Sequence, residues 1–218
     1  MLIKLILERF DTKGKLLERR EQQSKSWTIA FIQMLYVAHA QTTHSMDDIT
    51  GTARVVTGSS GNHKGPLKIG SPPGKSGTIC LCGGGGFAWD NSQQGKDIGI
   101  VVGTGATAVT PTDNVLDTRI DHGEGGGQLQ HGGTELYGLT IADPNGQFTA
   151  RRYFTNVSGG AITVNEAGLH SIGVISEAAS GEKVCAFPFL IARDVVAPGV
   201  SVLNNEILRV TYVPQITV

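Results

Sequence analysis

The chain has 218 residues, with 18 Lys plus Arg against 19 Asp plus Glu, and its formal net charge is −1. This balance gives no electrostatic reason to expect a nucleic-acid partner, and the length suits one sizeable domain or one domain with an appendage. Charged residues make up only 17% of the chain and the 30 glycines are about twice the average share, which favours β-structure with tight turns over disorder.

The three cysteines, Cys80, Cys82 and Cys185, form no recognisable framework. An odd number without regular spacing argues against a set of disulfides, and Cys-x-Cys is the wrong spacing for a zinc knuckle. We therefore expect small buried thiols in a reducing compartment.

The beginning of the chain predicts a β-hairpin. Residues 2–10 and 15–23 are the two candidate strands, and residues 11–14 between them form a turn that ends in Gly14. Glycine accepts a positive φ at little steric cost, which suits this turn. Two apolar segments joined by such a turn are typical of a hairpin.

Residues 27–39 predict a helix that follows this hairpin. Ser24 or Ser26 is expected to cap it, and its apolar stripe consists of Trp27, Phe31, Leu35 and Ala38. The segment also ends in Ala-x-Ala, like a signal-peptide cleavage site, but a long segment with several acidic residues precedes it. The apolar run is too short to span a membrane and is interrupted by Gln33. We expect a helix packed on protein.

Residues 41–97 show little periodicity. Short apolar pieces alternate with Gly- and Ser-rich stretches, which predicts either short strands with long loops or an arm that becomes ordered only against neighbours. No Gly-Lys-Ser/Thr follows the glycines of residues 83–86 at the spacing of a phosphate-binding loop. A flexible loop beside Phe87 and Trp89 is the preferred interpretation.

An apolar run over residues 98–102 leads into GTGATA, which matches a dinucleotide-binding Gly-x-Gly-x-x-Ala pattern through Gly103 and Gly105. That function requires a helix to begin inside the pattern, so that its first N–H groups face the pyrophosphate. Pro111 would then lie within the helix and lack the N–H that the helix needs. We therefore expect a loop that binds no nucleotide.

A better helix start lies a few residues further on. Thr110 suits the N-cap, Pro111 the first helical position and Asp113 the acidic partner in the first turn. The sequence thus predicts a short helix over residues 111–120.

From residue 98 onwards the pattern becomes regular, with turn signals at residues 143–146 and 156–160. Closely spaced short strands without intervening amphipathic helices predict an antiparallel β-sandwich. The expected strands cover residues 98–102, 134–142, 147–156, 161–166, 184–192 and 206–213. The expected organisation is a mainly β chain with a ββα unit over 1–40, a Gly-rich irregular segment or arm over 41–97, and a β-sandwich domain over 98–218.

The six histidines do not fall into a catalytic or metal-binding motif; they are His39, His44, His63, His122, His131 and His170. The sequence Asp-His-Gly-Glu at 121–124 and the nearby His131 lie in a Gly-rich loop. A small metal site is one interpretation of this loop, and solvated side chains are the preferred one. Residues 143–146 lack the downstream Glu of a calcium loop. No catalytic, cofactor-binding or metal-binding residue is assigned.

Glu166 lies between apolar strand residues in AITVNEAGL, and Arg193 ends the apolar segment FPFLIAR. A carboxylate in a strand-rich core is costly unless it is paired. Glu166 could be a general acid, which would need a cleft and a second carboxylate, or a surface residue at a strand end. The preferred interpretation is structural: Glu166 accepts hydrogen bonds from Arg193 or from nearby backbone N–H groups and locks its hairpin to the neighbouring strand.

Three segments of the C-terminal half resemble, in combination, a β-rich structural module of tailed-bacteriophage virion proteins, found in tail fibres and other surface-exposed parts. They are GTGATAVTPTDNVLDTRI at 103–120, GQFTARRYFTNVSGGAITVNEAGL at 146–169 and ARDVVAPGVSVLNNEILRVTYVPQITV at 192–218. The resemblance covers residues 98–218. It implies a virion building block in which Gly103, Gly105, Pro111 and Asp113 shape a structural loop.

The resemblance implies a non-enzymatic protein on the capsid or tail, with other virion proteins as partners and with no cofactor, nucleic acid or membrane. Assembly would take place in the host cytoplasm. A symmetric oligomer is expected because residues 41–97 have too little periodic apolar sequence to form their own core. The alternative is a receptor-binding tail-fibre protein that recognises a host glycan through loop aromatics such as Trp89, Phe87 and Tyr137. A third class, a cell-wall hydrolase or nucleotide-binding enzyme, has no motif behind it.

Overall fold

The computed structural model describes residues 2–24, 26–40, 43–57, 78–80, 86–88, 97–142, 145–176 and 184–217. This part of the chain is mainly β, with a single α-helix, α1 (Ile29–Ala40). The strands are β1 (Leu2–Phe10), β2 (Leu16–Ser24), β3 (Thr43–Asp47), β4 (Ala53–Thr57), β5 (Thr78–Cys80), β6 (Gly86–Ala88), β7 (Gly99–Gly103), β8 (Gln130–His131), β9 (Glu135–Ala142), β10 (Asn145–Thr155), β11 (Ile162–Ser176), β12 (Val184–Val202) and β13 (Ile207–Thr217).

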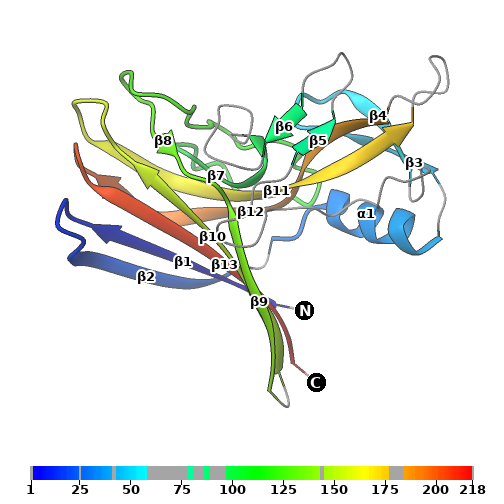
Figure 1. The fold of residues 1–218 in the computed structure, drawn as a ribbon, viewed down its shortest axis with the longest axis horizontal. Helices are drawn as coiled ribbons and strands as arrows, with labels where there is room; N and C mark the ends of the chain where they lie inside the picture. Colours follow the sequence, from blue (N-terminus) through cyan, green and yellow to red (C-terminus); the bar gives the residue numbers. More distant parts are fainter. Residues whose placement is uncertain are drawn as a thin grey trace.

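The strands form two large antiparallel sheets and one two-stranded sheet (Figure 1). The first large sheet has the order β2-β1-β13-β10-β8, and β9 also pairs with β10. The second has the order β12-β11-β4-β3, and β7 also pairs with β11. Because β1 pairs with β13, the N-terminal hairpin and the last strand share one sheet. The predicted mainly β, antiparallel sandwich with an N-terminal hairpin and helix is confirmed.

One cluster of buried apolar side chains draws on both large sheets. In β1, every second side chain from Ile3 to Leu7 is buried, as a strand with one face on a core requires. Members from the first sheet include Ile3, Leu5, Leu7, Val210 and Tyr212, and members from the second include Val164, Leu169 and Ile191. Removal of this apolar surface from water is the main driving force for the sandwich.

Two of the predicted turns are described, and hydrogen bonds between a side chain and the backbone close both of them. The Asp11 carboxylate accepts hydrogen bonds from the backbone N–H groups of Lys13 and Lys15, each at 2.8 Å, and Gly14 has a φ of 77°. In the turn over residues 156–160, the buried Asn156 donates to the backbone oxygens of Gly160 and Val202, each at 2.7 Å. The latter contact ties this turn to the end of β12.

Strands β11 and β12 run well beyond the predicted residues 161–166 and 184–192. Their ladder has register shifts between Val164 and Glu166 and between Leu169 and His170. Each shift changes which face the following side chains occupy, so the alternating pattern is broken although the strand continues. The sequence pattern therefore does not predict that β11 continues beyond residue 166.

Within the 41–97 segment, residues 43–57 form regular structure, as the alternative of short strands expects for this part. They form the hairpin β3–β4, which joins the second sheet where Val56 pairs with Ile175. The buried Asp48 stabilises the turn by accepting hydrogen bonds from the backbone N–H groups of Thr50 and Thr52 and from Arg54. The glycines at 83–85, Trp89 and the side chains of Phe87 and the three cysteines lie outside the described part.

Helix α1 begins two residues later than predicted and buries a different stripe. Because the helix begins at Ile29, Thr28 is the residue directly before it, and neither Ser24 nor Ser26 lies at the N-cap position. The Thr28 hydroxyl donates a hydrogen bond to the backbone oxygen of Leu190. The fully buried residues are Ala30, Met34 and Val37, whereas the predicted Trp27, Phe31, Leu35 and Ala38 are only partly buried. Almost every residue of this helix is apolar, so the sequence pattern does not define the buried face. No helix in the described ranges has the length and apolar character needed to cross a membrane.

The helix predicted over residues 111–120 is absent; the segment consists of turns and extended backbone. The backbone N–H of Ile120 donates to the oxygen of Val102, and that of Thr104 donates to the oxygen of Thr118. The end of the segment therefore pairs with β7 instead of forming hydrogen bonds within a helix. Local capping signals are overridden by these long-range contacts.

Candidate functional site

A buried polar site that joins the second sheet to the loop over residues 103–120 is centred on Glu166, in the middle of β11. Its side chain is completely buried. Arg193, on the neighbouring strand β12, donates from Nε to Glu166 Oε2 at 2.9 Å. The contact expected between these two residues is present, and it joins the two longest strands of the second sheet.

The loop over residues 103–120 wraps around the same carboxylate. Backbone N–H groups of Gly105, Asp117 and Thr118 donate to Glu166 at 3.2, 3.1 and 2.7 Å. Convergent backbone N–H groups are the usual means of holding an anion. Here the anion is a side chain of the protein itself. The Gly-x-Gly loop donates hydrogen bonds to the Glu166 carboxylate, whereas the loop of a dinucleotide site donates them to a phosphate.

Gly103 and Gly105 are required by the close approach of this loop to Glu166. A Cβ at Gly103 would lie 2.5 Å from the backbone oxygen of Thr118 and would also collide with the Glu166 carboxylate. A Cβ at Gly105 would lie 2.5 Å from the Cβ of Asp117 and 2.6 Å from Glu166 Oε1. Both distances are far inside van der Waals contact.

Arg193 extends the network to the start of the loop. Its Nη1 donates to Asp113 at 2.8 Å and its Nη2 to the backbone oxygen of Thr107 at 3.2 Å. Burial alone would lower the pKa of Arg193, but its hydrogen bonds to Asp113 and Glu166 outweigh this effect and raise the pKa. The network therefore fixes the loop to both β11 and β12.

Asp113 and Pro111 have roles that the sequence only partly predicts. The Asp113 carboxylate accepts hydrogen bonds from the backbone N–H and the hydroxyl of Thr110, as a helix cap would, although no helix follows. The backbone oxygen of Pro111 accepts a hydrogen bond of 2.7 Å from the N–H of Ile29, the first residue of α1. The loop thus also satisfies one of the free donors at the beginning of the helix.

We expect the charge of Asp113 to make part of the stability acid-sensitive. Burial would raise its pKa, but hydrogen bonds from Thr110 and Arg193 hold the pKa below the ordinary value of 3.8. A carboxyl whose pKa is lowered in the folded state stabilises the fold above its ordinary pKa, and this contribution disappears as the pH falls through the folded-state pKa. Asp113→Asn should therefore lower Tm at pH 7 and have a shrinking effect below about pH 4.

Thermal unfolding of the wild type and Asp113→Asn between pH 7 and pH 2 measures this dependence. A Tm difference that is the same at both ends of the range would exclude Asp113 as a source of the acid sensitivity.

His122, in the Gly-rich loop, uses its ring Nδ1 within the protein, and its ring packs on that of His131. His122 Nδ1 accepts the backbone N–H of His131 at 3.0 Å, and the two rings meet edge to face with centroids 5.4 Å apart. Glu124 accepts a hydrogen bond from Gln130, and Asp121 pairs with Arg119. Among the residues that the structure describes, no three His, Cys, Asp or Glu side chains gather in a way that could hold a metal.

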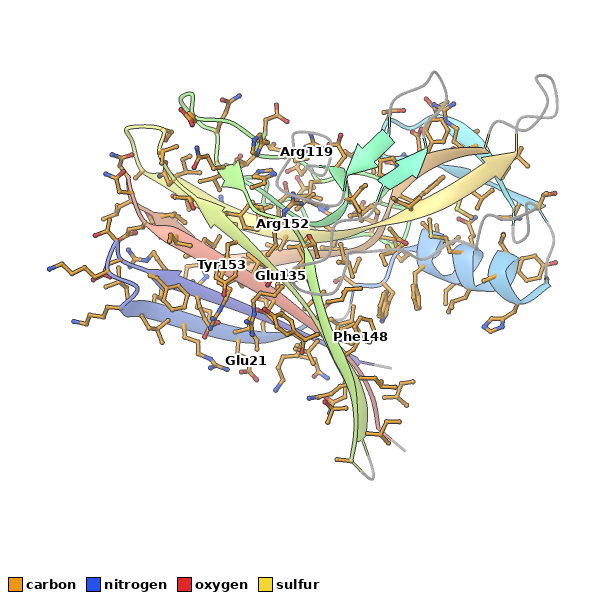
Figure 2. The ribbon with its side chains drawn as sticks, in the orientation of Figure 1. Glu21, Arg119, Glu135, Phe148, Arg152 and Tyr153 are labelled. Carbon is orange, nitrogen blue, oxygen red and sulfur yellow. The ribbon has the colours of Figure 1, made fainter. Side chains whose placement is uncertain are left out.

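A second buried polar site was missed by the sequence interpretation. Arg152 is buried in the interior (Figure 2) and donates to the backbone oxygens of Ile98, Ile100 and Gly132. Burial lowers its pKa to about 9. The sequence pattern could have predicted this burial, because Arg152 is two residues from both Ala150 and Phe154 in β10 and so shares their inward face.

His170 lies in the same region. Its Nδ1 is 2.9 Å from the backbone oxygen of Asp97, and burial lowers its pKa to about 4. The ring is therefore neutral at physiological pH and acts as a packed side chain rather than a proton donor.

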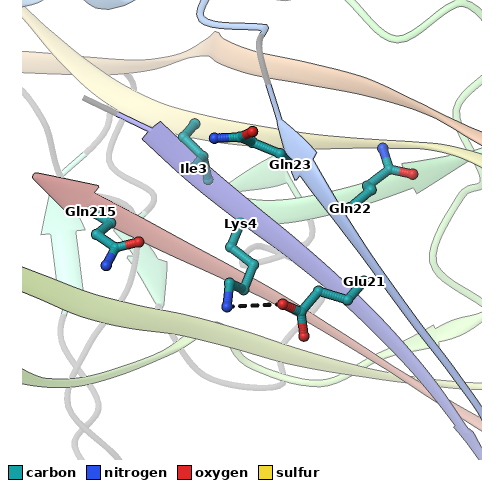
Figure 3. A pocket seen from close by; sticks show the side chains of 6 residues that line it. All are labelled: Ile3, Lys4, Glu21, Gln22, Gln23 and Gln215. Atoms are coloured by element: carbon teal, nitrogen blue, oxygen red, sulfur yellow. Dashed lines mark ion pairs between the residues drawn. The ribbon is translucent and has the colours of Figure 1, made fainter. Parts of the chain in front are cut away.

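A small surface pocket of about 210 Å³ lies along β1, β2 and the end of β13 (Figure 3). Its lining consists of Ile3, Lys4, Glu21, Gln22, Gln23 and Gln215, and we call it the glutamine pocket. Lys4 and Glu21 form an ion pair of 2.8 Å across it. Its volume is below the roughly 300–1,000 Å³ of most small-molecule sites, and its lining contains no aromatic ring.

Tyr137, one of the three aromatics expected to face a glycan, is engaged within the protein. Its hydroxyl donates to Glu135 at 2.7 Å, and the guanidinium of Arg151 lies 4.5 Å from the centre of its ring. No protein-family model, curated protein or solved structure matches this chain.

Proposed function

We propose that this chain is a non-enzymatic structural protein of a tailed-bacteriophage virion, exposed on the capsid or tail and assembled as a symmetric oligomer with other virion proteins. Its assembly would take place in the host cytoplasm. The proposal starts from the resemblance of residues 98–218 to a virion module. The observation that carries it is an apolar surface on the first sheet whose side chains are exposed among the residues that the structure describes.

This surface lies on the outer part of β9, β10 and β13, at residues 138–142, 145–149 and 214–217. From here on, these residues, and not residues 41–97, are called the arm. Figure 1 shows the β9–β10 hairpin projecting away from the rest of the molecule. Leu139, Ile141 and Ile216 on the arm are 68%, 78% and 54% exposed. Contiguous apolar side chains exposed in this way mark surfaces that are covered by a partner.

The polar network supports a rigid building block. Glu166 is surrounded by four hydrogen-bond donors and is closed off from solvent, an arrangement that suits cross-linking of loop and strands. A fully satisfied buried network of this kind specifies one packing arrangement.

The presence of the chain in virus particles tests the proposal. Particles purified on a density gradient from a culture of the source organism should contain the chain in a fixed ratio to the other particle proteins. Mass spectrometry and an antibody against the chain would measure this ratio. Recovery of the chain only in the particle-free fractions would contradict the proposal.

The alternative is a receptor-binding tail-fibre protein that recognises a host glycan. The glutamine pocket favours it, because amide groups and a charged pair can form hydrogen bonds with sugar hydroxyl groups. A glycan array should then show binding that Gln23→Ala weakens and that Gln128→Ala, a loop substitution outside the pocket, leaves unchanged. Equal binding by both variants, or no binding by the wild type, would argue against this alternative.

A further inference from the structure

The uncovered surface of the arm is a continuation of the core-facing side of the first sheet. Gly146 pairs with Ile141 on one side and with Ile216 on the other, so these three residues share one face. By alternation along β13, Ile216 has the same orientation as Tyr212, which is buried in the core. The inner face of the sheet therefore extends past the part that the second sheet covers.

A second apolar surface lies on the outer side of α1. Ile29, Ile32 and Tyr36 are 51%, 60% and 57% exposed. Their spacing of three and four residues places them on one side of the helix, and we call them the helix stripe. The sequence of α1, IAFIQMLYVAHA, contains no Asp, Glu, Lys or Arg. Nor does the stretch of β9 from residue 136 to 142.

The two surfaces match in chemistry and size. The helix stripe is about 10 Å long at 1.5 Å per residue. The arm face is about 10 Å wide across its three strands and about 7 Å long between Leu139 and Ile141. A helix laid on a sheet is a standard way to bury two apolar faces, and neither surface has a charge that would have to be desolvated.

The arm and helix stripe of one chain cannot cover each other. Figure 1 shows the outer ends of β9 and β10 and helix α1 at separate parts of the molecule. A contact between them must therefore join two copies, with the arm of one copy on the helix of the next. Such a head-to-tail contact generates a ring when its rotation closes, and it leaves no arm or helix unpaired.

We propose that the arm docks on the helix stripe of a neighbouring copy of this chain. This inference deepens the proposed virion function and rests on it. The six side chains are 51–78% exposed, so even at the roughly 150–250 Å² that a large aromatic side chain buries they can bury no more than about 900 Å² in total. That is less than the roughly 1,200–2,000 Å² of a stable pair. A single contact is therefore weak, and the oligomer becomes stable only when each copy both gives an arm and receives one.

Charge substitutions at the two surfaces test this contact. Ile141→Asp on the arm and Ile32→Lys on the helix stripe should each weaken the association of the full-length chain about 30-fold or more, as loss of a central interface residue does. Sedimentation velocity over a concentration series measures the association. Leu203→Asp, at an exposed apolar residue outside both surfaces, is the matched control and should leave association unchanged.

Mixing the two charged variants separates this arrangement from others. In a 1:1 mixture the wild-type arm of Ile32→Lys can dock on the wild-type helix stripe of Ile141→Asp, and the Asp of one variant meets the Lys of the other. Association of the mixture should therefore be stronger than that of either variant alone. Circular dichroism of each variant verifies that the fold is intact. A failure of the mixture to assemble, or wild-type association by Ile141→Asp alone, would overturn the arm-to-helix contact. Either result leaves the particle-composition test of the virion function unaffected.

Discussion

Glu166→Gln is expected to lower the free energy of unfolding by about 3–5 kcal/mol, the usual cost of removing one partner of a buried ion pair. For a chain of this size the loss corresponds to a fall in Tm of about 6–20 °C. Glutamine has nearly the same shape, so the effect comes from the lost charge. Its amide NH₂ would also face the donors that now point at the carboxylate, among them Arg193 and the N–H of Thr118.

Denaturant unfolding of the purified variant measures this loss. Glu21→Gln is the matched control, because Glu21 forms ion pairs with Lys4 and Arg19 at the surface of β2. Exposed pairs contribute about 0–1 kcal/mol, so this control should unfold close to the wild type. Equal midpoints for Glu166→Gln and Glu21→Gln would show that the buried carboxylate does not hold the loop to the strands.

Gly103→Ala is expected to destabilise the protein by about 1–3 kcal/mol or more, because the added methyl group has no space. Its carbon would lie 2.5 Å from the backbone oxygen of Thr118, and a backbone atom cannot rotate away as a side chain can. The loop would have to move off Glu166, which would remove the hydrogen bonds that the N–H groups of Asp117 and Thr118 donate to it.

Gly160→Ala provides the comparison for this substitution. A Cβ at Gly160 would meet no atom within 4 Å, so its unfolding midpoint should stay near that of the wild type. Hydrogen exchange should also become faster at the N–H groups of Asp117 and Thr118 in Gly103→Ala only. If Gly103→Ala unfolds like Gly160→Ala, the glycine is not required by the close approach to the carboxylate.

The fold class was predictable in part because β1 alternates between buried and less buried positions from Ile3 to Leu7. The turn at residues 11–14 also has a recognisable acidic and glycine signature. The lengths of β11 and β12 were not predictable, since the register shifts break the pattern on which strand prediction depends. The buried face of α1 was not predictable either, because nearly all of its residues are apolar.

The candidate site was predictable in its centre but not in its surroundings. An acidic residue among apolar strand positions pointed to a buried partner, and Arg193 supplies it. The loop conformation was wrong in the prediction because local signals favoured a helix after Thr110. A helix would have used the N–H groups of Asp117 and Thr118, which donate instead to Glu166, 48 or more residues away in sequence. Contacts of that range are invisible to a local pattern.

The most direct test of the virion function is a cryo-electron map of the gradient-purified particles. The expected result is density for this sandwich at positions repeated by the symmetry of the capsid or tail, with the β9–β10 arm of each copy on the α1 helix of its neighbour. A complete map of the particle in which no density accommodates the two sheets and α1 would contradict the proposal that this chain is a building block of the virion.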